Sequence, residues 1–420
     1  MHLSVRNLAK IESAEMDFNG ITLIVGNNNT GKSTAGKILY AIFNSMYNFK
    51  ERIYRERYNA CRRALRSILR PLPHGYGGVE QQDSGFISDF LNQSKSDEQI
   101  RYAIESLAKF RHVDVDLSQV LSEMESARKP TDDEMRKRLV KDYFSSVFHD
   151  QYLSLFNTRK GAVVELTIKA MVTRVMLRKT STELLRKFEI EHPAYYIDTP
   201  ELLRNLNDSW LDCQGSGLGE SLVSAIRKGI IAQKANRQSV LDGIMSDERL
   251  GRVFGGFRAV MDGAFLYDDA RNIVFKDGRF KEALELDNLS VGLKSFGLIL
   301  AAIKYQALKP RDVIILDEPE IHLHPEWQLK YAELIVLLQK TLDLTVLLTS
   351  HSPDFIQALY LYAKKHGVSA RLNAYVSRQR ENGMVSFEDV PSENWDKVFD
   401  KFMSPMDQIT ALREELENYA

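Results

Sequence analysis

Residues 21–34, ITLIVGNNNTGKST, constrain the fold of this chain more than any other stretch. Ile21 to Val25 are β-branched or apolar and predict a buried strand. Gly26 to Ser33 follow directly and fit G-x-x-x-x-G-K-[ST], the pattern of a phosphate-binding P-loop. A helix beginning near Lys32 would direct its positive dipole end at the same anion. The apolar spacing that predicts this helix is Ile38, Ile42 and Met46. Strand, loop and helix in this order predict a nucleoside triphosphate site.

The residue types of the loop each have a chemical role in this interpretation. Gly26 and Gly31 let the backbone turn so that N–H groups point at phosphate oxygens. Lys32 supplies a point charge for the β- and γ-phosphates, and Ser33 offers a hydroxyl to Mg²⁺. The remaining residues that we expect to contact the nucleotide are Asn27, Asn28, Asn29, Thr30 and Thr34.

Composition excludes several classes of protein. With 420 residues, of which 44% are hydrophobic, the chain is long enough for two or three domains, or for one domain with a large insertion. A formal net charge of −1 argues against a protein that coats nucleic acid, though not against a basic patch. Cys61 and Cys213 form no metal or disulfide pattern and suit a reducing compartment. We find neither a signal peptide nor an apolar run of 18 residues, and expect a soluble cytoplasmic protein.

The periodicity after the P-loop predicts a long amphipathic helix from Lys32 to Arg70, ended by Pro71. Its other faces are strongly basic. The cations are Lys50, Arg52, Arg55, Arg57, Arg62, Arg63, Arg66 and Arg70. Two interpretations stay open: a solvated helix face, or a contact with a nucleic-acid backbone or an acidic partner.

Residues 45–260 are expected to form a mostly helical insertion with some strands. It would include a loop over 74–85, a helix opened by the capping box of Thr131 and Glu134, strands over 162–168 and 195–197, and a loop over 214–219. One or two strands are expected within residues 2–18, and short strands near 264–266, 273–275 and 283–286. The domain prediction is therefore an α/β ATPase core in two parts, 1–44 and 261–370, the insertion 45–260, and a C-terminal hairpin and helix over 371–420.

A second pattern, VIILDEP at 313–319, describes a buried parallel strand that ends in paired carboxylates. Asp317 would hold Mg²⁺ through the water shell of the ion, since a hard cation requires oxygen ligands. Glu318 would polarise the attacking water as general base. The alternative for an isolated match is a core strand followed by an acidic turn.

Two further patterns complete the set. In NLSVGLKS at 288–295, Ser290 and Gly292 open an apolar helix over 296–308 and could offer donors to a phosphate, although an ordinary helix N-cap explains the same residues. The strand predicted over 345–349 ends in Ser350 and His351. A lone histidine is more often structural, but at the end of this sheet a γ-phosphate contact is geometrically natural.

The order of these four motifs resembles the ABC ATPase class. LSVGLKSFGLIL, IILDEPEIHLHPEWQ and LLTSHSPDFIQAL are similar to the SMC/RecF/OLD branch, and within it to OLD-type ATPases of bacterial anti-phage systems such as the Septu and PARIS ATPases. The resemblance covers residues 3–34 and 289–359. It implies an ABC-type P-loop ATPase head that uses ATP and Mg²⁺.

The resemblance also implies residue roles and an assembly. Lys32, Glu318 and His351 would be catalytic, His351 as the switch histidine, while Ser33 and Asp317 would hold the metal. The residues expected to face the γ-phosphate of ATP held by a second copy are Ser290, Gly292 and Lys294. Such a composite site requires a head-to-head homodimer or a higher even oligomer.

Three departures from the family pattern matter. Val291 replaces the usual second glycine of the signature, which weakens a transporter interpretation. The glutamine loop has only Gln81 and Gln82 as candidates, by order alone. The segment with His322, His324 and Pro325 fits either the dimer seam or a local helix cap.

The C-terminal residues carry no pattern of a Toprim nuclease, which OLD proteins have behind the ATPase. They predict a hairpin of strands 372–377 and 384–390 around Asn382-Gly383, then a helix from about Ser404. The resulting hypothesis is an ATPase subunit of an anti-phage complex that acts as an ATP-switched scaffold for a separately encoded effector, a nuclease of HNH or Toprim type. The alternative is a RecF- or SMC-type DNA-repair ATPase that contacts DNA through Lys50 to Arg70. A transporter subunit is disfavoured by the long insertion.

Overall fold

The computed structural model describes residues 1–69, 79–94, 96–157, 159–186, 188–207, 218–236, 248–258, 260–268 and 272–391, and isolated residues beyond 391. The chain divides into two compact units. The sheet unit comprises Met1–Ser45, Asp142–Phe188 and His192–Ala420, and the helical unit comprises Met46–Lys141 and Glu189–Glu191. The fold is mixed α/β, as the sequence predicts.

An 11-stranded sheet organises the sheet unit, in the order β6-β5-β4-β1-β2-β14-β13-β3-β12-β11-β7. Its parallel part consists of β13 (Leu372–Gln379), β3 (Ile21–Val25), β12 (Thr345–Ser350), β11 (Val313–Asp317) and β7 (Ala194–Ile197). Every residue of β3 and β7 is buried, because both faces of this part are covered and an uninterrupted apolar run is required there.

The other strands are mostly antiparallel and extend the sheet beyond β13. They are β14 (Val385–Val390), β2 (Ile11–Asp17), β1 (His2–Leu8), β4 (Ala162–Ile168), β5 (Met171–Leu177) and β6 (Thr182–Leu185). Strands β4 to β7 fall within residues 45–260 and pair in this main sheet. The C-terminal hairpin exists as predicted, but β13 pairs with β3 in parallel, so it too belongs to the main sheet.

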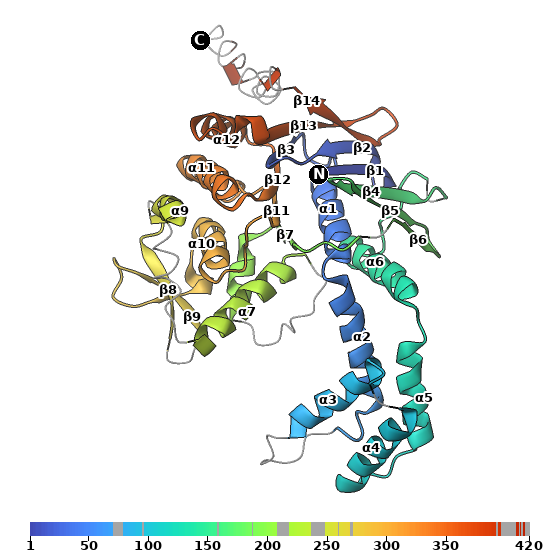
Figure 1. Ribbon diagram of the computed structural model, residues 1–420. Helices are drawn as coiled ribbons and strands as arrows, with labels where there is room; N and C mark the ends of the chain where they lie inside the picture. The colour runs from blue at the N-terminus through green and yellow to red at the C-terminus, as the bar shows by residue number, and fades with distance from the viewer. Residues whose placement is uncertain are drawn as a thin grey trace. The chain divides into compact units, whose positions relative to one another are not determined.

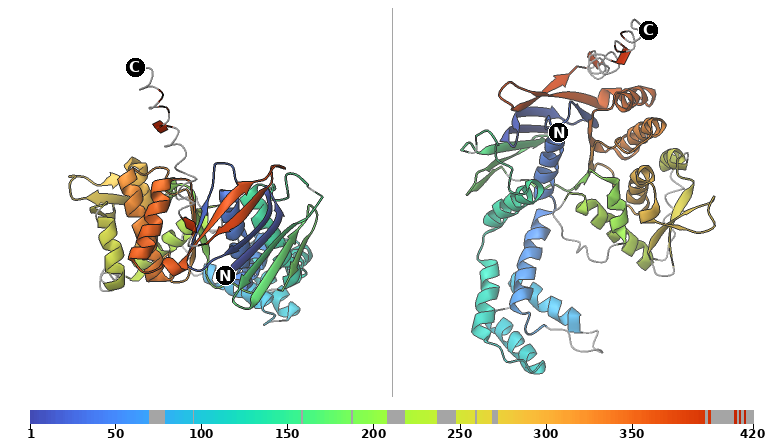
Figure 2. Two further views of the ribbon diagram at one scale, coloured as in Figure 1. Left: turned by 90° about the horizontal axis from the view of Figure 1, so that it is seen from above. Right: turned by 180° about the vertical axis from the view of Figure 1, so that it is seen from behind.

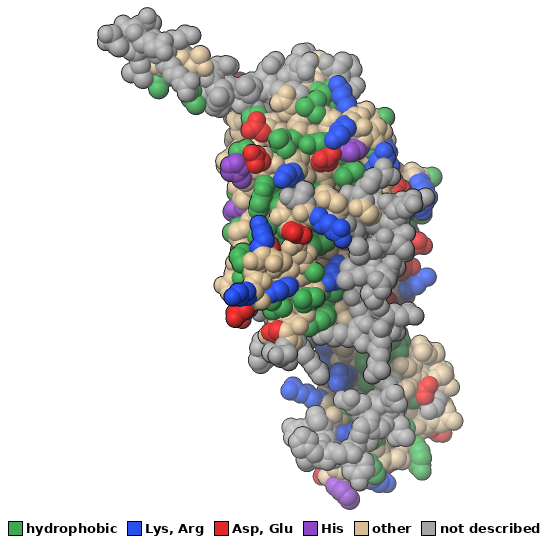
Figure 3. Space-filling model, turned by 90° about the vertical axis from the view of Figure 1, so that its left-hand side faces the viewer, with side chains coloured by type: hydrophobic (Ala, Val, Ile, Leu, Met, Phe, Trp, Pro, Cys, Tyr) green, Lys and Arg blue, Asp and Glu red, His purple; other side chains and the backbone are tan. Residues whose placement is uncertain are grey.

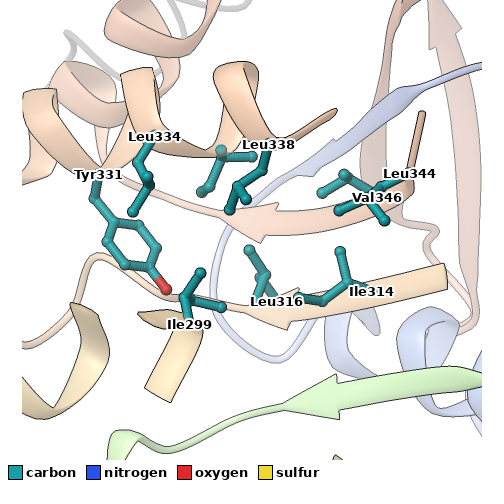
Figure 4. A pocket seen from close by; sticks show the side chains of 9 residues that line it. Ile299, Ile314, Leu316, Tyr331, Leu334, Leu338, Leu344 and Val346 are labelled. Carbon is teal, nitrogen blue, oxygen red and sulfur yellow. The ribbon is translucent and has the colours of Figure 1, made fainter. Parts of the chain in front are cut away.

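Helices cover both faces of the parallel strands (Figures 1 and 2). Helix α1 (Lys32–Met46) packs on one face, where Gly36 approaches Ile315 of β11. The opposite face carries α10 (Val291–Lys304), α11 (Pro325–Leu342) and α12 (Pro353–Lys365). Figure 4 shows Ile314, Leu316 and Val346 pointing from the strands at apolar side chains of α10 and α11. Successive side chains of β11 thus pack against helices on opposite faces of the sheet, which fixes the register of the strand.

Smaller elements surround α10. The 3₁₀ helix η1 (Pro200–Leu206) and α7 (Glu220–Asn236) pack on it, and α9 (Glu248–Arg258) packs on α11. A three-stranded sheet of β8 (Gly263–Tyr267), β9 (Ile273–Asp277) and β10 (Leu284–Glu285) leads into η2 (Leu286–Asn288). These strands lie where the sequence predicts them. η3 (Ser369–Arg371) precedes β13.

The helical unit contains α2 (Phe49–Ala64), α3 (Val79–Leu91), α4 (Asp97–Phe110), α5 (Leu117–Arg128) and the start of α6 (Asp132–Phe148). Its apolar core includes Cys61, Ile87, Ile104 and Met124. The capping box of α6 is present: Thr131 N donates to Glu134 Oε2 at 2.8 Å, and Glu134 N donates to Thr131 Oγ1 at 3.3 Å.

Two predictions in this region are wrong. The single helix over 32–70 is broken, because Asn48 adopts a left-handed φ of 46° between α1 and α2, and α2 ends at Ala64. The loop over 74–85 is helical from Val79, where α3 begins. Two single residues, Arg70 and Cys213, lie outside the described residues. So do most of the loop over 214–219 and most of the helix predicted from Ser404.

Candidate functional site

The carboxyl ends of three neighbouring parallel strands bring the predicted site residues together. Val25, the last residue of β3, is opposite Ser350 of β12, and Thr349 is opposite Asp317 of β11. The P-loop, the paired carboxylates and His351 therefore leave the sheet at one edge. Ligands of open parallel sheets bind outside this edge.

The P-loop is folded tightly around its two glycines. A Cβ on Gly26 would lie 2.0 Å from Ser377 Oγ and 2.9 Å from Thr30 Oγ1, so a larger residue would displace Ser377 or the loop. Gly31 has a φ of 78°, a conformation that side chains disfavour. Thr30 Oγ1 donates to Asn27 O at 2.7 Å and lies 2.6 Å from Ser377 Oγ. Ser377 of β13 thus supports the loop from a strand far away in the sequence.

Lys32 is almost fully buried, with 4% of its side chain exposed. Its Nζ donates to the loop carbonyls of Gly26 at 2.9 Å and Asn27 at 3.0 Å. The same ammonium lies 3.1 Å from Glu318 Oε1. The P-loop cation and the expected general base are therefore direct neighbours.

Ser33 and Asp317, the expected metal ligands, are in contact. Ser33 Oγ donates to Asp317 Oδ1 at 3.0 Å. Thr349 Oγ1 donates to the same oxygen at 2.5 Å, and Tyr196 OH donates to Oδ2 at 2.6 Å. Burial, and then the charge of Asp317, raise the pKa of Tyr196 far above its ordinary value, so the phenol keeps its proton. A hydroxyl and a carboxylate this close together are oxygen groups of the kind that Mg²⁺ takes as ligands.

Glu318 occupies a strained backbone position. Its φ of 49° lies in the left-handed region, which is rare for residues other than glycine and is concentrated at functional sites. Its N–H donates to Thr349 O at 3.1 Å and to Thr349 Oγ1 at 3.0 Å, which holds this conformation. His351 Nδ1 lies 3.4 Å from Glu318 Oε1, and its ring is half-exposed.

Glu320 is a buried carboxyl outside the predicted site residues. Its Oε1 accepts from Ser350 Oγ at 2.5 Å and from His351 N at 3.3 Å. Burial is the largest effect on this group and raises its pKa, against the opposing effect of these bonds. Glu320 therefore joins the segment after β11 to the segment that carries His351.

Asp198 is another residue at this edge, directly after β7. Its pKa is raised by burial and by the charge of Asp317, while Lys37 lowers it. Among the missed residues, Tyr196 and Asp198 had a sequence signal: an apolar strand that ends in an acid, as at 313–317. Ser377 and Thr349 had none, because their roles depend on strand pairing.

The signature residues lie apart from these contacts. Ser290 is the N-cap of α10 and accepts from Leu293 N at 3.4 Å, so the helix-cap alternative describes its local role. Gly292 is packed against Trp327, which leaves 3.1 Å for a Cβ. Lys294, predicted to face a phosphate, is buried and its Nζ lies 3.0 Å from Glu201 Oε2. Within the part of the chain that the structure describes, no hydrogen bond or ion pair joins these residues to residues 26–34.

The remaining predicted residues are placed as follows. Gln81 and Gln82 lie in α3 of the helical unit, in a helix rather than a loop, and their side chains are outside the description. His324 occupies the N-cap position of α11 with Pro325 at the first helical position, but its side chain makes no capping hydrogen bond. His322 precedes this cap and its backbone carbonyl lies beside Gly292.

Comparison with known families gives two matches, on either side of the middle of the chain. Residues 1–141 match the family described as AAA ATPase domain, and residues 216–356 match the family described as AAA domain, putative AbiEii toxin, Type IV TA system. Comparison with curated proteins gives no match.

Solved structures with a similar chain include SMC heads. The SMC head bound to the C-terminal winged-helix domain of ScpA has 12% identity and a TM-score of 0.47, with 93% of this chain and 98% of that chain covered. The SMC head domain from Thermotoga maritima has 13% identity and a TM-score of 0.39, with 93% and 98% covered. The Pyrococcus furiosus SMC head bound to the C-terminal domain of ScpA has 11% identity and a TM-score of 0.43, with 95% and 98% covered.

The two matched regions, both described as AAA domains, include the P-loop at 26–33 and the paired carboxylates at 317–318. These matches agree with the predicted ATPase, and the mixed α/β fold of the structure confirms the predicted fold class. No helix within the described residues has the length and apolar character needed to cross a membrane.

Proposed function

We propose that the chain binds and hydrolyses ATP at the carboxyl edge of its central sheet, and that it serves as the ATP-switched subunit of a bacterial anti-phage complex. The observation that carries the catalytic part is the convergence of Lys32, Ser33, Asp317, Glu318 and His351 from three strands.

Each of these residues has a chemical task in hydrolysis. Backbone N–H groups of the P-loop and the Lys32 ammonium bind the phosphates, for which Lys32 exchanges its contacts with loop carbonyls. Ser33 and Asp317 would hold Mg²⁺, which neutralises phosphate charge when bound. Glu318 would accept a proton from the attacking water, and His351, whose Nδ1 lies 3.4 Å from Glu318 Oε1, would contact the γ-phosphate.

The second element of the proposal is a homodimer with two composite sites. Ser290 and Gly292 lie at the start of α10 without a described bond to the P-loop, which is compatible with a role toward a second copy. Apolar side chains are exposed next to them: Val291 is 37% exposed and Ile321 is 54% exposed. A twofold arrangement would bury the same patch on both subunits.

The effector is the third element. The family matched at 216–356 is described as a putative toxin of a toxin–antitoxin system, which supports a function exerted together with a second component. The proposed effector is a separately encoded nuclease of HNH or Toprim type, bound more tightly in one nucleotide state than in the other. Coupling of this kind is typically worth about 1–3 kcal/mol.

A DNA-repair ATPase of the RecF or SMC type is the second candidate. Its supporting observation is α2 and the turn after it, where Arg62, Arg63 and Arg66 are exposed and make no ion pair with a described residue. Other cations of this segment are neutralised: Arg57 pairs with Asp132 at 2.9 Å, and Arg55 with Glu51 at 2.7 Å. Figure 3 shows Lys and Arg side chains interspersed with Asp and Glu on one face of the sheet unit, so the described side chains of that face do not form a basic patch for DNA.

Separate experiments test the catalytic assignment in vitro and the proposed role in phage protection in the host. Lys32→Ala should abolish binding of ATP, whereas Glu318→Gln should retain binding, block turnover and accumulate dimer, because the phosphate site is intact without the base. Purified protein with plasmid DNA, ATP and Mg²⁺ should leave the DNA uncut, and Lys32→Ala in the host should remove phage protection. Unchanged hydrolysis in Glu318→Gln would refute the catalytic assignment. Protection that survives Lys32→Ala would favour the repair-type candidate.

A further inference from the structure

Tyr196 is a buried phenol whose hydroxyl donates a hydrogen bond to Asp317, the expected metal ligand. Its side chain is fully buried, and OH donates to Asp317 Oδ2 at 2.6 Å. The ring meets Tyr40 of α1 edge to face, with centroids 6.0 Å apart. Gly36 lies against the same ring, where an added Cβ would be 3.2 Å from Tyr196 Cε2. The position of the phenol is thus fixed by α1 and β7 together.

The other oxygen of Asp317 is the one directed at Ser33. Oδ1 accepts from Ser33 Oγ at 3.0 Å and from Thr349 Oγ1 at 2.5 Å. With a donor on each oxygen, rotation of the carboxylate about its last bond would break a hydrogen bond at Oδ2. Asp317 therefore presents a fixed oxygen on the Ser33 side.

We propose that Tyr196 is a positioning residue for magnesium: it orients the Asp317 carboxylate so that Oδ1 and Ser33 Oγ face the metal together. The inference rests on the proposed ATP site and adds a residue outside the recognised motifs. Partners behind a metal ligand typically change metal affinity by about 10–100-fold when removed. The P-loop contacts to the phosphates do not pass through Tyr196, so nucleotide binding without metal is independent of it.

The chain offers a matched control on the preceding residue. Tyr195 is also buried on β7, but alternation along the strand places its side chain on the opposite face, where OH donates to Ala307 O at 2.9 Å. Tyr195→Phe and Tyr196→Phe each remove one buried hydroxyl from the same strand. Only the second removes a donor to Asp317.

The experiment measures binding of a fluorescent ATP analogue to the full-length chain, first in EDTA and then across a Mg²⁺ titration. In EDTA, we expect Tyr196→Phe to bind the analogue with the same affinity as the parent and as Tyr195→Phe. Its Mg²⁺ midpoint should be raised by about 10-fold or more, and excess Mg²⁺ should restore parental binding. Thermal unfolding of both variants shows whether each is folded, and restoration by Mg²⁺ is a result that a folding defect would not give.

The outcomes are distinguishable. A Mg²⁺ midpoint for Tyr196→Phe within twofold of the parent, or an equal shift in Tyr195→Phe, overturns the positioning role. Parental protein that binds no nucleotide with or without Mg²⁺ overturns the proposed function itself.

Discussion

The ion pair between Lys294 and Glu201 yields a quantitative prediction, because Glu201 is the counter-ion of the buried Lys294 within one chain. Lys294 Nζ lies 3.2 Å from Glu201 Oε1 and 3.0 Å from Oε2. The lysine side chain is 6% exposed, and the glutamate side chain is 37% exposed. Glu201→Gln keeps the shape of the acceptor and removes its charge, which leaves a buried ammonium without a counter-ion.

The magnitude follows from this burial. Removing one partner of a fully buried pair costs about 3–5 kcal/mol. Since Glu201 is more than one-third exposed, solvent screens the pair, and we expect Glu201→Gln to lower the free energy of unfolding by about 1–3 kcal/mol. Lys294→Met removes the charge that needs a partner and should cost less. The double variant should lose less free energy of unfolding than the sum of the losses in the two single variants.

Urea unfolding of the parent, both single variants and the double variant gives the coupling free energy. Glu282→Gln, at an exposed position beyond β9, is the matched control and should stay within about 0.5 kcal/mol of the parent. If Glu201→Gln behaves like this control, or if the two changes add within about 0.5 kcal/mol, the intramolecular pair does not hold Lys294. Loss of ATP-induced dimer in Lys294→Met alone would then return the lysine to the phosphate role.

Three further outcomes are expected. Gly26→Ala should lower stability by about 1–3 kcal/mol and weaken nucleotide binding, because its Cβ would lie 2.0 Å from Ser377 Oγ; Gly85→Ala, with open space around it, is the control in thermal unfolding and binding assays. Ser290→Arg should retain ATP binding and lose dimer by light scattering, and an unchanged dimer would argue against signature contacts in trans. Burial raises the pKa of Glu320 above its ordinary 4.5, so the folded state binds its proton more tightly than the unfolded state does. The free energy of unfolding of the parent, relative to that of Glu320→Gln, should therefore fall as the pH rises above 4.5. A difference that does not change with pH would contradict this.

The parts of the site that the sequence predicts are those carried by short contiguous patterns. β3 with the P-loop, β11 with its carboxylates and β12 with His351 each combine an apolar run with polar residues at its end. Parallel pairing then requires their ends to meet, so the proximity of Lys32, Asp317 and Glu318 follows from the motifs. The capping box of α6 is predicted for the same reason, since its residues are three apart.

The misses depend on pairings between distant segments. The helix period continues across Asn48, so periodicity could not reveal the break, although an asparagine tolerates the left-handed conformation found there. The C-terminal hairpin was visible as a local pattern, but nothing in it shows that β13 lies beside β3. The support that Ser377 gives to Thr30 therefore required the structure.

Thr349 joins these observations, because one side chain serves both carboxylates of the site. Its Oγ1 donates to Asp317 Oδ1 at 2.5 Å and accepts from Glu318 N at 3.0 Å. Ser350, the next residue, donates to Glu320, and His351 follows. The end of β12 thus contacts the expected metal ligand and the expected base and leads directly into His351, the expected switch histidine. A displacement of His351 by phosphate or by a second subunit would be transmitted along the same few bonds to Asp317 and Glu318, so metal binding and proton transfer are expected to respond together.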